Sequence, residues 1–296
     1  MKAFEMNGTN IHKASGEIPS TENQPIRYDL YIPGSRSRDL LPVLLFIHGF
    51  KGFKDWGPFP WACEDLAREG FAVVAINLSL NGVGKNPTAF DRLDLFERET
   101  LSQDLDDIGT VIEAIKSRTI HSARVDLNTD WIGIAGHSRG GHTAVAAAAE
   151  YPEIQCLVTW SAVADYNARW SEQMISDWES RGYTEIKNSR TGQVMRLDRC
   201  VYNDALENSD RLIALKRVRE LHLPALFIAG KKDEAVSWKD SDQLYRNCPS
   251  VTKELRIIAG AGHTFNASHP FEENDYPEKF AEVLNLTRGW FLENLS

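Results

Sequence analysis

The 296-residue sequence predicts an α/β protein in which helices cover both faces of a mostly parallel central sheet. Two observations indicate this fold class. Short apolar segments of strand length alternate along the chain with longer segments of helical periodicity, and several of the apolar segments end directly in glycine-containing loops. Because parallel strands bring their carboxyl ends to one edge of a sheet, residues in these loops are expected to lie together there, where such sheets bind ligands.

The first half of the chain supplies four of the expected strands and a possible fifth at its beginning. Residues 1–25 are polar and form a lead-in or a short edge strand. Strands are expected at 26–32, 42–47 and 71–78, and helices at 61–69 and 102–118. Ser102 is the expected N-cap of the second helix, and a long polar connection covers residues 79–98. Trp131 to Ala135 is apolar without alternation, which is typical of a buried strand.

The second half continues the alternation with one interruption. Strands are expected at 155–160, 224–229 and 253–258, and helices at 143–150, 238–246 and 278–292. Between the sixth and seventh strands lie roughly sixty residues, far more than a usual α/β connection. We therefore interpret residues 161–222 as a cap inserted into a core domain formed by 1–160 and 223–296. Helices at 167–181 and 210–220 and a hairpin around 187–192 are expected in the insertion.

Composition excludes several function classes. The formal net charge of −9 and the pI of about 5.4 argue against a nucleic-acid or anionic membrane surface. We expect neither a secretory signal nor a transmembrane segment. The four cysteines are far apart and show no metal-ligand spacing, so free thiols, no bound metal and a cytoplasmic location are expected: Cys63, Cys156, Cys200 and Cys248. Composition leaves the oligomeric state open.

The chain carries a Gly136-x-Ser138-x-Gly140 motif between a predicted strand and a helix rich in small residues. This context is that of a nucleophile elbow, in which the serine lies on a strained turn and larger neighbours would clash. We expect the Ser138 hydroxyl at the top of the sheet and the Arg139 backbone N–H aimed at the reacting carbonyl. Taken alone, the pentapeptide is equally compatible with an idle serine in a glycine-rich turn.

A reactive serine needs a base and an acid that orients the base. Asp233 follows the strand at 224–229, with Glu234 as a competing carboxylate. His263 follows the last strand in a Gly-Ala-Gly-His segment. Ser138, Asp233 and His263 thus occur in the chain order of α/β hydrolases, each just after a strand. Packing, hydrogen-bonding or turn roles are expected for four other histidines: His48, His137, His142 and His269.

On these motifs and on His48-Gly49-Phe50, the chain resembles the α/β-hydrolase superfamily from about residue 26 to residue 293. Within it, the chain is similar to dienelactone-hydrolase-like and cinnamoyl- or feruloyl-esterase-like carboxylesterases. The resemblance implies that Ser138 is the nucleophile, Asp233 the acid and His263 the base. It also implies that the backbone amides of Phe50 and Arg139 form the oxyanion hole. Dienelactone hydrolases have a cysteine nucleophile where this chain has Ser138, which argues against dienelactone hydrolysis.

The expected function is that of a serine esterase that cleaves small-molecule carboxylic esters through an acyl-enzyme, with no cofactor because no nucleotide-binding loop is present. Thioesters and lactones stay open as substrates. A prolyl-oligopeptidase-like peptidase is an alternative, although the lead-in of about forty residues is short for the propeller domain of such enzymes. A catalytically silent binding protein is another, against which the intact Ser–Asp–His set argues. Trp170 and Trp178 are expected to share one helix face above Ser138 and to bind substrate.

Overall fold

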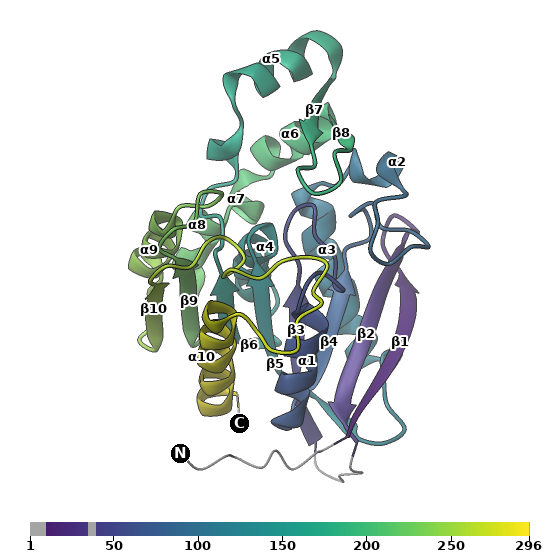
Figure 1. The fold of residues 1–296 in the computed structure, drawn as a ribbon, viewed down its shortest axis with the longest axis vertical. Coiled ribbons are helices and arrows are strands. Elements are labelled where there is room, and N and C mark those ends of the chain that lie inside the picture. The colour runs from purple at the N-terminus through teal and green to yellow at the C-terminus, as the bar shows by residue number, and fades with distance from the viewer. Residues whose placement is uncertain (1–9, 35–39, 296) are drawn as a thin grey trace.

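The computed structural model describes residues 10–34 and 40–295, and its centre is an eight-stranded sheet in the order β1-β2-β4-β3-β5-β6-β9-β10 (Figure 1). The strands are β1 (Ile11–Pro19), β2 (Pro25–Pro33), β3 (Leu40–Ile47), β4 (Ala72–Asn77), β5 (Asp126–His137), β6 (Ile154–Trp160), β9 (Ala225–Gly230) and β10 (Lys253–Ile258). β2 is antiparallel to both of its neighbours, and the other pairs are parallel. The predicted mostly parallel sheet is therefore confirmed, with β1 as the edge strand; residues 1–9 of the predicted lead-in lie outside the described residues.

Helices cover both faces of the sheet, as the sequence predicts (Figure 1). They are α1 (Phe59–Arg68), α3 (Leu101–Lys116), α4 (Arg139–Glu150), α9 (Trp238–Asn247) and α10 (Glu278–Asn294), whereas the short α2 (Leu93–Phe96) lies in the connection between β4 and α3. Strand residues alternate between the faces: Val43 and Leu45 of β3 pack in the core beneath α3 and α4, whereas Leu44 and Phe46 pack in the core beneath α1 and α10. No helix in the described ranges is long and apolar enough to cross a membrane.

Two local predictions were wrong. The connection 79–98 is not merely polar, because its apolar side chains Leu80, Val83, Phe90 and Phe96 are buried. Trp131 is 45 % exposed, and the buried part of β5 begins one residue later. Which of these side chains are buried depends on tertiary packing, and the composition of a segment does not reveal that packing.

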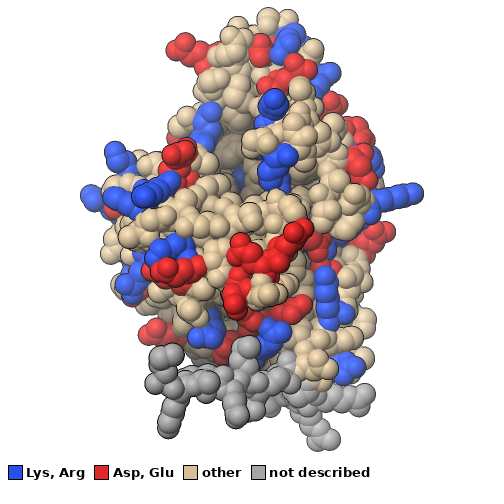
Figure 2. Space-filling model, viewed as in Figure 1, with Lys and Arg blue, Asp and Glu red and all other residues tan. Residues whose placement is uncertain are grey.

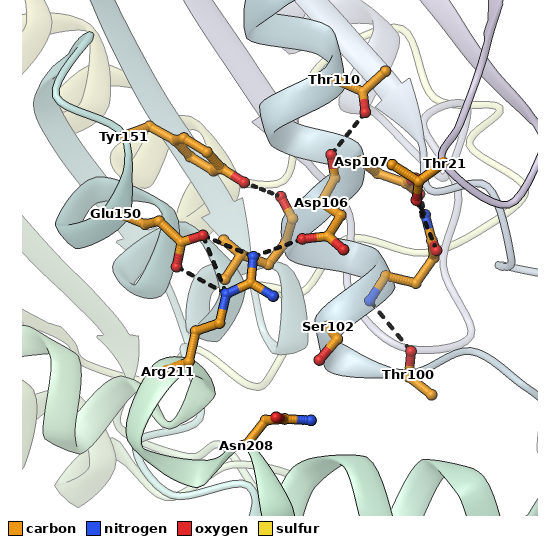
Figure 3. Close-up of polar contacts among 12 residues, drawn as sticks. Thr21, Thr100, Ser102, Asp106, Asp107, Thr110, Glu150, Tyr151, Asn208 and Arg211 are labelled. Carbon is orange, nitrogen blue, oxygen red and sulfur yellow. Dashed lines mark hydrogen bonds and ion pairs between the residues drawn. The ribbon is translucent and has the colours of Figure 1, made fainter.

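The N-cap of α3 is Thr100 rather than the predicted Ser102. The Thr100 hydroxyl oxygen accepts a hydrogen bond from the Gln103 N–H at 3.2 Å (Figure 3). The Ser102 hydroxyl instead donates to the Asp204 carboxylate at 2.5 Å. Ser102 therefore joins α3 to the inserted segment, a contact 102 residues away in sequence.

The insertion between β6 and β9 projects beyond the carboxyl ends of the strands (Figure 1). It contains η1 (Asn167–Arg169), α5 (Glu172–Arg181), β7 (Tyr183–Lys187), β8 (Val194–Asp198), α6 (Arg199–Glu207), α7 (Ser209–Leu212), α8 (Ala214–Arg217) and η2 (Val218–Glu220). The predicted hairpin is confirmed as β7–β8. The predicted continuous helix at 167–181 is wrong, because Trp170 is extended and the Ser171 side chain caps a new helix. The predicted helix at 210–220 is likewise split into short turns, and α6 was not foreseen.

Ionic contacts fasten the base of the insertion to the core helices. Arg211 of α7 contacts Glu150 at the end of α4 and Asp106 of α3, with nitrogen–oxygen distances of 2.7 and 2.6 Å (Figure 3). All three side chains are partly exposed, so such a network is worth at most about 1 kcal/mol per pair. The base of the insertion thus lies against the sheet-covering helices, while α5 and the hairpin stand clear of them (Figure 1).

Candidate active site

Ser138 lies on the sharp turn between β5 and α4. Its backbone has φ 57° and ψ −118°, a conformation that residues other than glycine rarely adopt. Hydrogen bonds hold the turn on both sides: the Ser138 N–H donates to the Trp160 carbonyl at 2.8 Å, and the Ser138 carbonyl accepts from the His142 N–H at 3.0 Å. The strained conformation is therefore fixed by β6 and by the first turn of α4.

The glycines on either side of Ser138 are required by close backbone contacts. A Cβ atom at Gly136 would lie 2.2 Å from the Gly140 carbonyl oxygen, and one at Gly140 would lie 2.2 Å from the His48 carbonyl oxygen. Neither distance is possible between real atoms without moving a strand end. The Gly-x-Ser-x-Gly spacing is thus a steric requirement of this turn, as the sequence predicts.

His263 lies between Ser138 and Asp233. Its Nε2 is 3.0 Å from the Ser138 Oγ, and its Nδ1 is 2.8 Å from an Asp233 carboxylate oxygen. The other Asp233 oxygen accepts from the backbone N–H groups of Ala235 and Val236 at 2.9 and 2.8 Å. The competing carboxylate, Glu234, is exposed. The structure therefore brings together the three residues that the sequence singled out, from the ends of β5, β9 and β10.

The Asp233 carboxylate is fully buried and ionised. Burial by itself would raise its pKa, but the hydrogen bond and charge of His263 and the Val236 N–H outweigh burial and lower it below the ordinary value. An ionised carboxylate accepts a hydrogen bond from the Nδ1–H of His263, which leaves Nε2 free to take a proton from Ser138. The arrangement can thus generate an alkoxide-like nucleophile.

His137 supports the loop that carries His263. Its Nε2 is 3.0 Å from the His263 backbone carbonyl, and the two rings are 4.7 Å apart between centroids. Burial, with a smaller contribution from the charge of His263, lowers the pKa of His137 to about 3. His137 is therefore neutral and adds no charge beside a protonated His263.

The loop after β3 brings Phe50 to the elbow. The loop approaches closely, because a Cβ at Gly49 would be 2.9 Å from the Ser138 Cβ. Buried His48 braces it: Nδ1–H donates to the Gly49 carbonyl at 2.9 Å, and Nε2 accepts from the Leu78 N–H at 3.3 Å. Burial lowers the pKa of His48 to about 4.

Phe50 and Arg139, the two predicted oxyanion-hole residues, line the same cavity as Ser138. Arg139 is the first residue of α4, and the N–H groups of a helix's first turn have no partner within the helix. Its backbone N–H therefore has no partner within the helix, as a donor of an oxyanion hole requires.

The Arg139 side chain forms a buried charge cluster that sequence reasoning missed. Its guanidinium lies 2.7 Å from Asp104 and 3.7 Å from Glu99. It also stands 5.4 Å from the ring centroids of both Phe50 and Tyr166. Burial raises the pKa of Glu99 to about 8 and that of Asp104 to about 6, against the opposing charge of Arg139. Acidic residues at the start of a predicted helix look like ordinary dipole partners, so the sequence held no signal for their burial.

A cavity of about 470 Å³ opens in front of Ser138. The strand-end loops provide one wall and the insertion provides the other, through residues that include Tyr166, Trp170, Met174 and Ile186. Trp170 therefore lies where the sequence predicted a substrate contact.

Trp178 does not line this cavity. It is fully buried behind Trp170, edge-on to it at 5.1 Å between ring centroids, and it stacks on Tyr202 at 4.9 Å. Its indole N–H donates to the Leu197 carbonyl at 3.0 Å. The break between η1 and α5 removes the shared helix face on which the predicted substrate contact of Trp178 depended, so that prediction was wrong.

The described residues contain neither a cluster of metal-ligating side chains nor a disulfide. In residues 10–34 and 40–295, no group of three or more His, Cys, Asp or Glu side chains is placed to hold a metal ion. All four cysteines are free; Cys200 is exposed and the other three are buried.

The sheet order, the elbow after β5 and the Ser–Asp–His arrangement define an α/β hydrolase. The chain belongs to the prolyl oligopeptidase family, whose members it matches over residues 58–291. Among curated proteins it is 23 % identical to the uncharacterised peptidase YuxL of Bacillus subtilis over 86 % of this chain and 35 % of that protein. It is 28 % identical to chlorophyllase type 0 of Chenopodium album over 52 % of this chain and 43 % of that protein. The chain thus spans less than half the length of these two relatives.

Solved structures share the fold at low sequence identity. Est1E from Butyrivibrio proteoclasticus with ferulic acid bound has a TM-score of 0.70 at 22 % identity, covering 94 % of this chain and 98 % of that one. Dienelactone hydrolase from Anabaena variabilis has a TM-score of 0.60 at 18 % identity, covering 97 % and 99 %. The suspected α/β-hydrolase relationship is confirmed, and at these identities the likeness establishes the fold alone.

Proposed function

We propose that the protein is a serine esterase that hydrolyses small-molecule carboxylic esters through an acyl-enzyme. The observation that carries this proposal is the hydrogen-bonded chain from Ser138 through His263 to Asp233, with the serine hydroxyl open to a cavity. A strained serine, a base within hydrogen-bond distance and a buried acid behind the base are the parts that acyl transfer requires.

The site residues have distinct roles in the proposed mechanism. Ser138 Oγ attacks the ester carbonyl as its proton passes to His263 Nε2, and Asp233 stabilises the imidazolium. The backbone N–H groups of Phe50 and Arg139 stabilise the oxyanion. His263 then gives the proton to the departing alcohol. In the second half of the reaction, water attacks the acyl-enzyme as its proton passes to His263, which then returns a proton to Ser138 Oγ as the acid leaves. No step requires a cofactor.

We also propose that residues 161–222 act as a cap. This segment supplies a large part of the cavity wall, and several of its lining residues are apolar, including Trp170, Met174 and Ile186. An apolar wall of this kind buries the part of the ester that does not react and uses that binding energy at the reacting carbonyl.

Peptide hydrolysis is the second candidate, because the family is named for oligopeptidases and one relative is described as a peptidase. The same triad can cleave either bond. This chain covers about a third of that relative, so the short lead-in before β3 does not decide between the two activities.

The deciding experiment combines covalent labelling with a substrate panel. A fluorophosphonate should label Ser138 alone in stoichiometric amount, and Ser138→Ala should lower kcat by about 10⁶-fold, as removal of a triad serine does elsewhere. Aryl and aliphatic esters should be turned over, and aminoacyl amides of matched size should not. Labelling at another serine would contradict the mechanism, and amide cleavage at the rate of esters would favour the peptidase.

A further inference from the structure

The cavity in front of Ser138 has the opposite charge to the protein as a whole. The chain has 42 acidic and 33 basic residues. Among the described residues that line the cavity there is no Asp or Glu, but there are four cations: Lys51, Arg139, Arg169 and Arg190. Figure 2 shows Lys and Arg side chains flanking a hollow on the upper part of the molecule, while most Asp and Glu side chains of this face lie elsewhere.

Two of these cations are accounted for by the protein itself. Arg139 is paired with Asp104 and Glu99, as described above. Arg169 donates to the Ala235 carbonyl at 2.5 Å, and its charge lies near enough to the Asp240 carboxylate to oppose the rise that burial causes in the pKa of that group. Their positions are explained without any ligand, so they do not indicate one.

Lys51 and Arg190 are different, because neither contacts a carboxylate within the described part of the chain. Arg190, at the tip of the β7–β8 hairpin, donates to the Lys51 backbone carbonyl at 2.6 Å. Its guanidinium lies over the rings of Phe53 and Trp56, at 5.7 and 5.9 Å from their centroids. The Lys51 ammonium is 5.9 Å from the Phe50 ring centroid. The hairpin and the loop after β3 therefore place two unneutralised cations at the same end of the cavity.

These two cations disfavour each other. Burial lowers the pKa of Lys51, and the charge of Arg190 lowers it further. Burial also lowers the pKa of Arg190. Lys51 is partly buried and Arg190 is exposed, so solvent screens part of the repulsion between the two like charges, and an anion between them removes the rest.

Asn188 supplies an independent observation at the same end of the cavity. It lines the cavity and is only 2 % exposed. Its Oδ1 accepts from the Arg190 backbone N–H at 3.1 Å, which assigns the two hydrogens to Nδ2. That Nδ2 is buried and has no acceptor in the described residues. An unpaired buried donor costs about 1–3 kcal/mol, so an acceptor atom of a ligand is expected here.

We infer that Lys51, Arg190 and Asn188 form a carboxylate-binding subsite, and that the preferred esters carry a carboxylate distant from the scissile bond. The inference rests on the proposed esterase function and names its substrate class. A carboxylate has two acceptor oxygens in one plane, which can accept from a guanidinium, an ammonium and an amide at once. The aromatic walls at Phe50 and Trp56 suit a flat spacer between the carboxylate and the ester.

The test compares esters that differ only in charge. The first pair is 4-acetoxybenzoate and its methyl ester, with the charge on the leaving group. The second pair is the phenyl hemiester of glutaric acid and its methyl ester, with the charge on the acyl group. The wild-type protein should favour the anionic member of at least one pair by about tenfold or more in kcat/KM, a factor worth about 1.4 kcal/mol.

Variants should then reduce that ratio. Lys51→Met and Arg190→Gln should each lower the anionic-to-neutral ratio of kcat/KM by at least about fivefold, and Asn188→Ala by a smaller factor. Lys187→Met is the matched control, because Lys187 is an exposed cation of the same hairpin that does not line the cavity. It should leave the ratio unchanged. Equal loss in all three charge variants would mean that only the general field of the protein matters, which would overturn the subsite.

Failure of the subsite and failure of the function give different results. Hydrolysis of the neutral esters without preference for the anionic ones would overturn the subsite and leave the esterase proposal intact. Absence of turnover for every ester would overturn the esterase proposal. In that case, calorimetric titration of Ser138→Ala with 4-acetamidobenzoate and 4-acetamidobenzamide decides the subsite, since binding of the carboxylate should be tighter and Arg190→Gln should abolish the difference.

Discussion

The two walls of the cavity are built by different means. The floor consists of the loops at the ends of β3, β5, β9 and β10, which carry Phe50, Ser138, Asp233 and His263. The roof consists of the insertion, which contributes Trp170 and the β7–β8 hairpin. In the floor, close contacts between backbone atoms hold the turn that carries Ser138. In the roof, the lining residues are held mainly by packing between side chains.

Close contacts show the difference. A methyl group added at Gly136 or Gly140 of the floor would meet backbone atoms at 2.2 Å. In the roof, a Cβ at Gly182 or Gly192 would meet nothing within 4 Å, although the positive φ values of 78° and 74° disfavour a side chain at both positions. Contact with backbone atoms therefore excludes a side chain at the floor glycines, whereas at the roof glycines only the local backbone conformation disfavours one. Substitutions in the floor should slow all substrates alike, and substitutions in the roof should change which substrates are preferred.

After the loss of Ser138 itself, the largest expected effect comes from the acid of the floor. Asp233→Asn should fold normally and lower kcat by about 10⁴-fold, because an amide can donate to His263 and stabilise the wrong tautomer. The loss should be the same for a small acetate and for a bulky aryl ester. Steady-state kinetics on both esters measure it.

Glu234→Gln is the matched control for that substitution. Glu234 is the next residue in the chain and is exposed, so its loss of charge should change kcat less than about twofold. A damaging Glu234→Gln together with a mild Asp233→Asn would show that the acid is misassigned by one residue.

A smaller effect is expected where the floor and roof meet. The Arg139 guanidinium lies between Phe50 of the floor and Tyr166 of the insertion. The guanidinium thereby contacts the floor and the insertion close to Phe50 and Arg139, whose backbone amides form the proposed oxyanion hole. Arg139→Lys keeps the charge but loses the planar fork, so the amides should shift and kcat should fall by about 10–100-fold, with little change in KM.

This substitution has its own control for folding. The ion pairs of Arg139 are buried, and a misfolded variant would lose activity for an unrelated reason. Fluorophosphonate labelling of Ser138 and a thermal melt therefore accompany the kinetics. A rise in KM with an unchanged kcat would contradict the positioning role.

The roof should show the reverse pattern, with a still smaller effect on activity. Trp170→Ala should lower kcat/KM for bulky aryl esters by about tenfold and barely change that of a small acetate, because Trp170 lines the cavity. Trp178→Ala should instead lower the free energy of unfolding by roughly 3–5 kcal/mol, since its side chain is wholly buried. Denaturant titration and the ratio of the two specificities separate the outcomes. Equal losses on both esters for Trp170→Ala would remove it from the binding wall.

The floor could be predicted from the sequence far better than the roof. The elbow is dictated by local steric needs, so Gly136 and Gly140 mark it directly, and the strand-before-loop pattern places Asp233 and His263 at the same edge. Nothing local distinguishes Trp170 from Trp178. Their roles depend on the break at Ser171 and on the packing of Trp178 against Tyr202, which lies in an unforeseen helix.

The buried charges of the floor were equally hidden. Glu99 lies near the end of a segment that looks polar, and only the approach of α4 buries it against Arg139. In the same way, Lys51 and Arg190 are 139 residues apart in sequence, and the hairpin brings them together. Sequence patterns report local structure, whereas charge clusters depend on which distant elements meet.

The smallest expected effect concerns stability. A buried carboxylate of the floor should make the free energy of unfolding depend on pH, and an exposed carboxylate of the roof should not. Burial raises the pKa of Glu99 to about 8, above the ordinary value of 4.5. Between these two pH values the folded protein holds a proton that the unfolded chain has released, so stability falls as pH rises, by at most about 1.4 kcal/mol per pH unit. Above about pH 8 this contribution stops changing.

The sign is opposite for the buried histidines. Burial lowers the pKa values of His48 and His142 to about 4 and that of His137 to about 3, so these groups destabilise the fold only as pH falls below the ordinary value of 6.5. The range from pH 6.5 to 8.5 therefore isolates the carboxylates, among which Asp107, raised by burial to about 7, also contributes.

Glu99→Gln keeps the shape of the side chain but has no proton to lose. Its Tm should fall less between pH 6.5 and 8.5 than that of the wild-type protein, by several degrees at roughly 2–4 °C per kcal/mol. Glu185→Gln, an exposed carboxylate of β7 in the roof, should follow the wild-type curve. Thermal melts at four pH values measure the three slopes. If Glu99→Gln kept the wild-type slope, the buried proton would belong to Asp107 or Asp104, and the corresponding asparagine variants would show which.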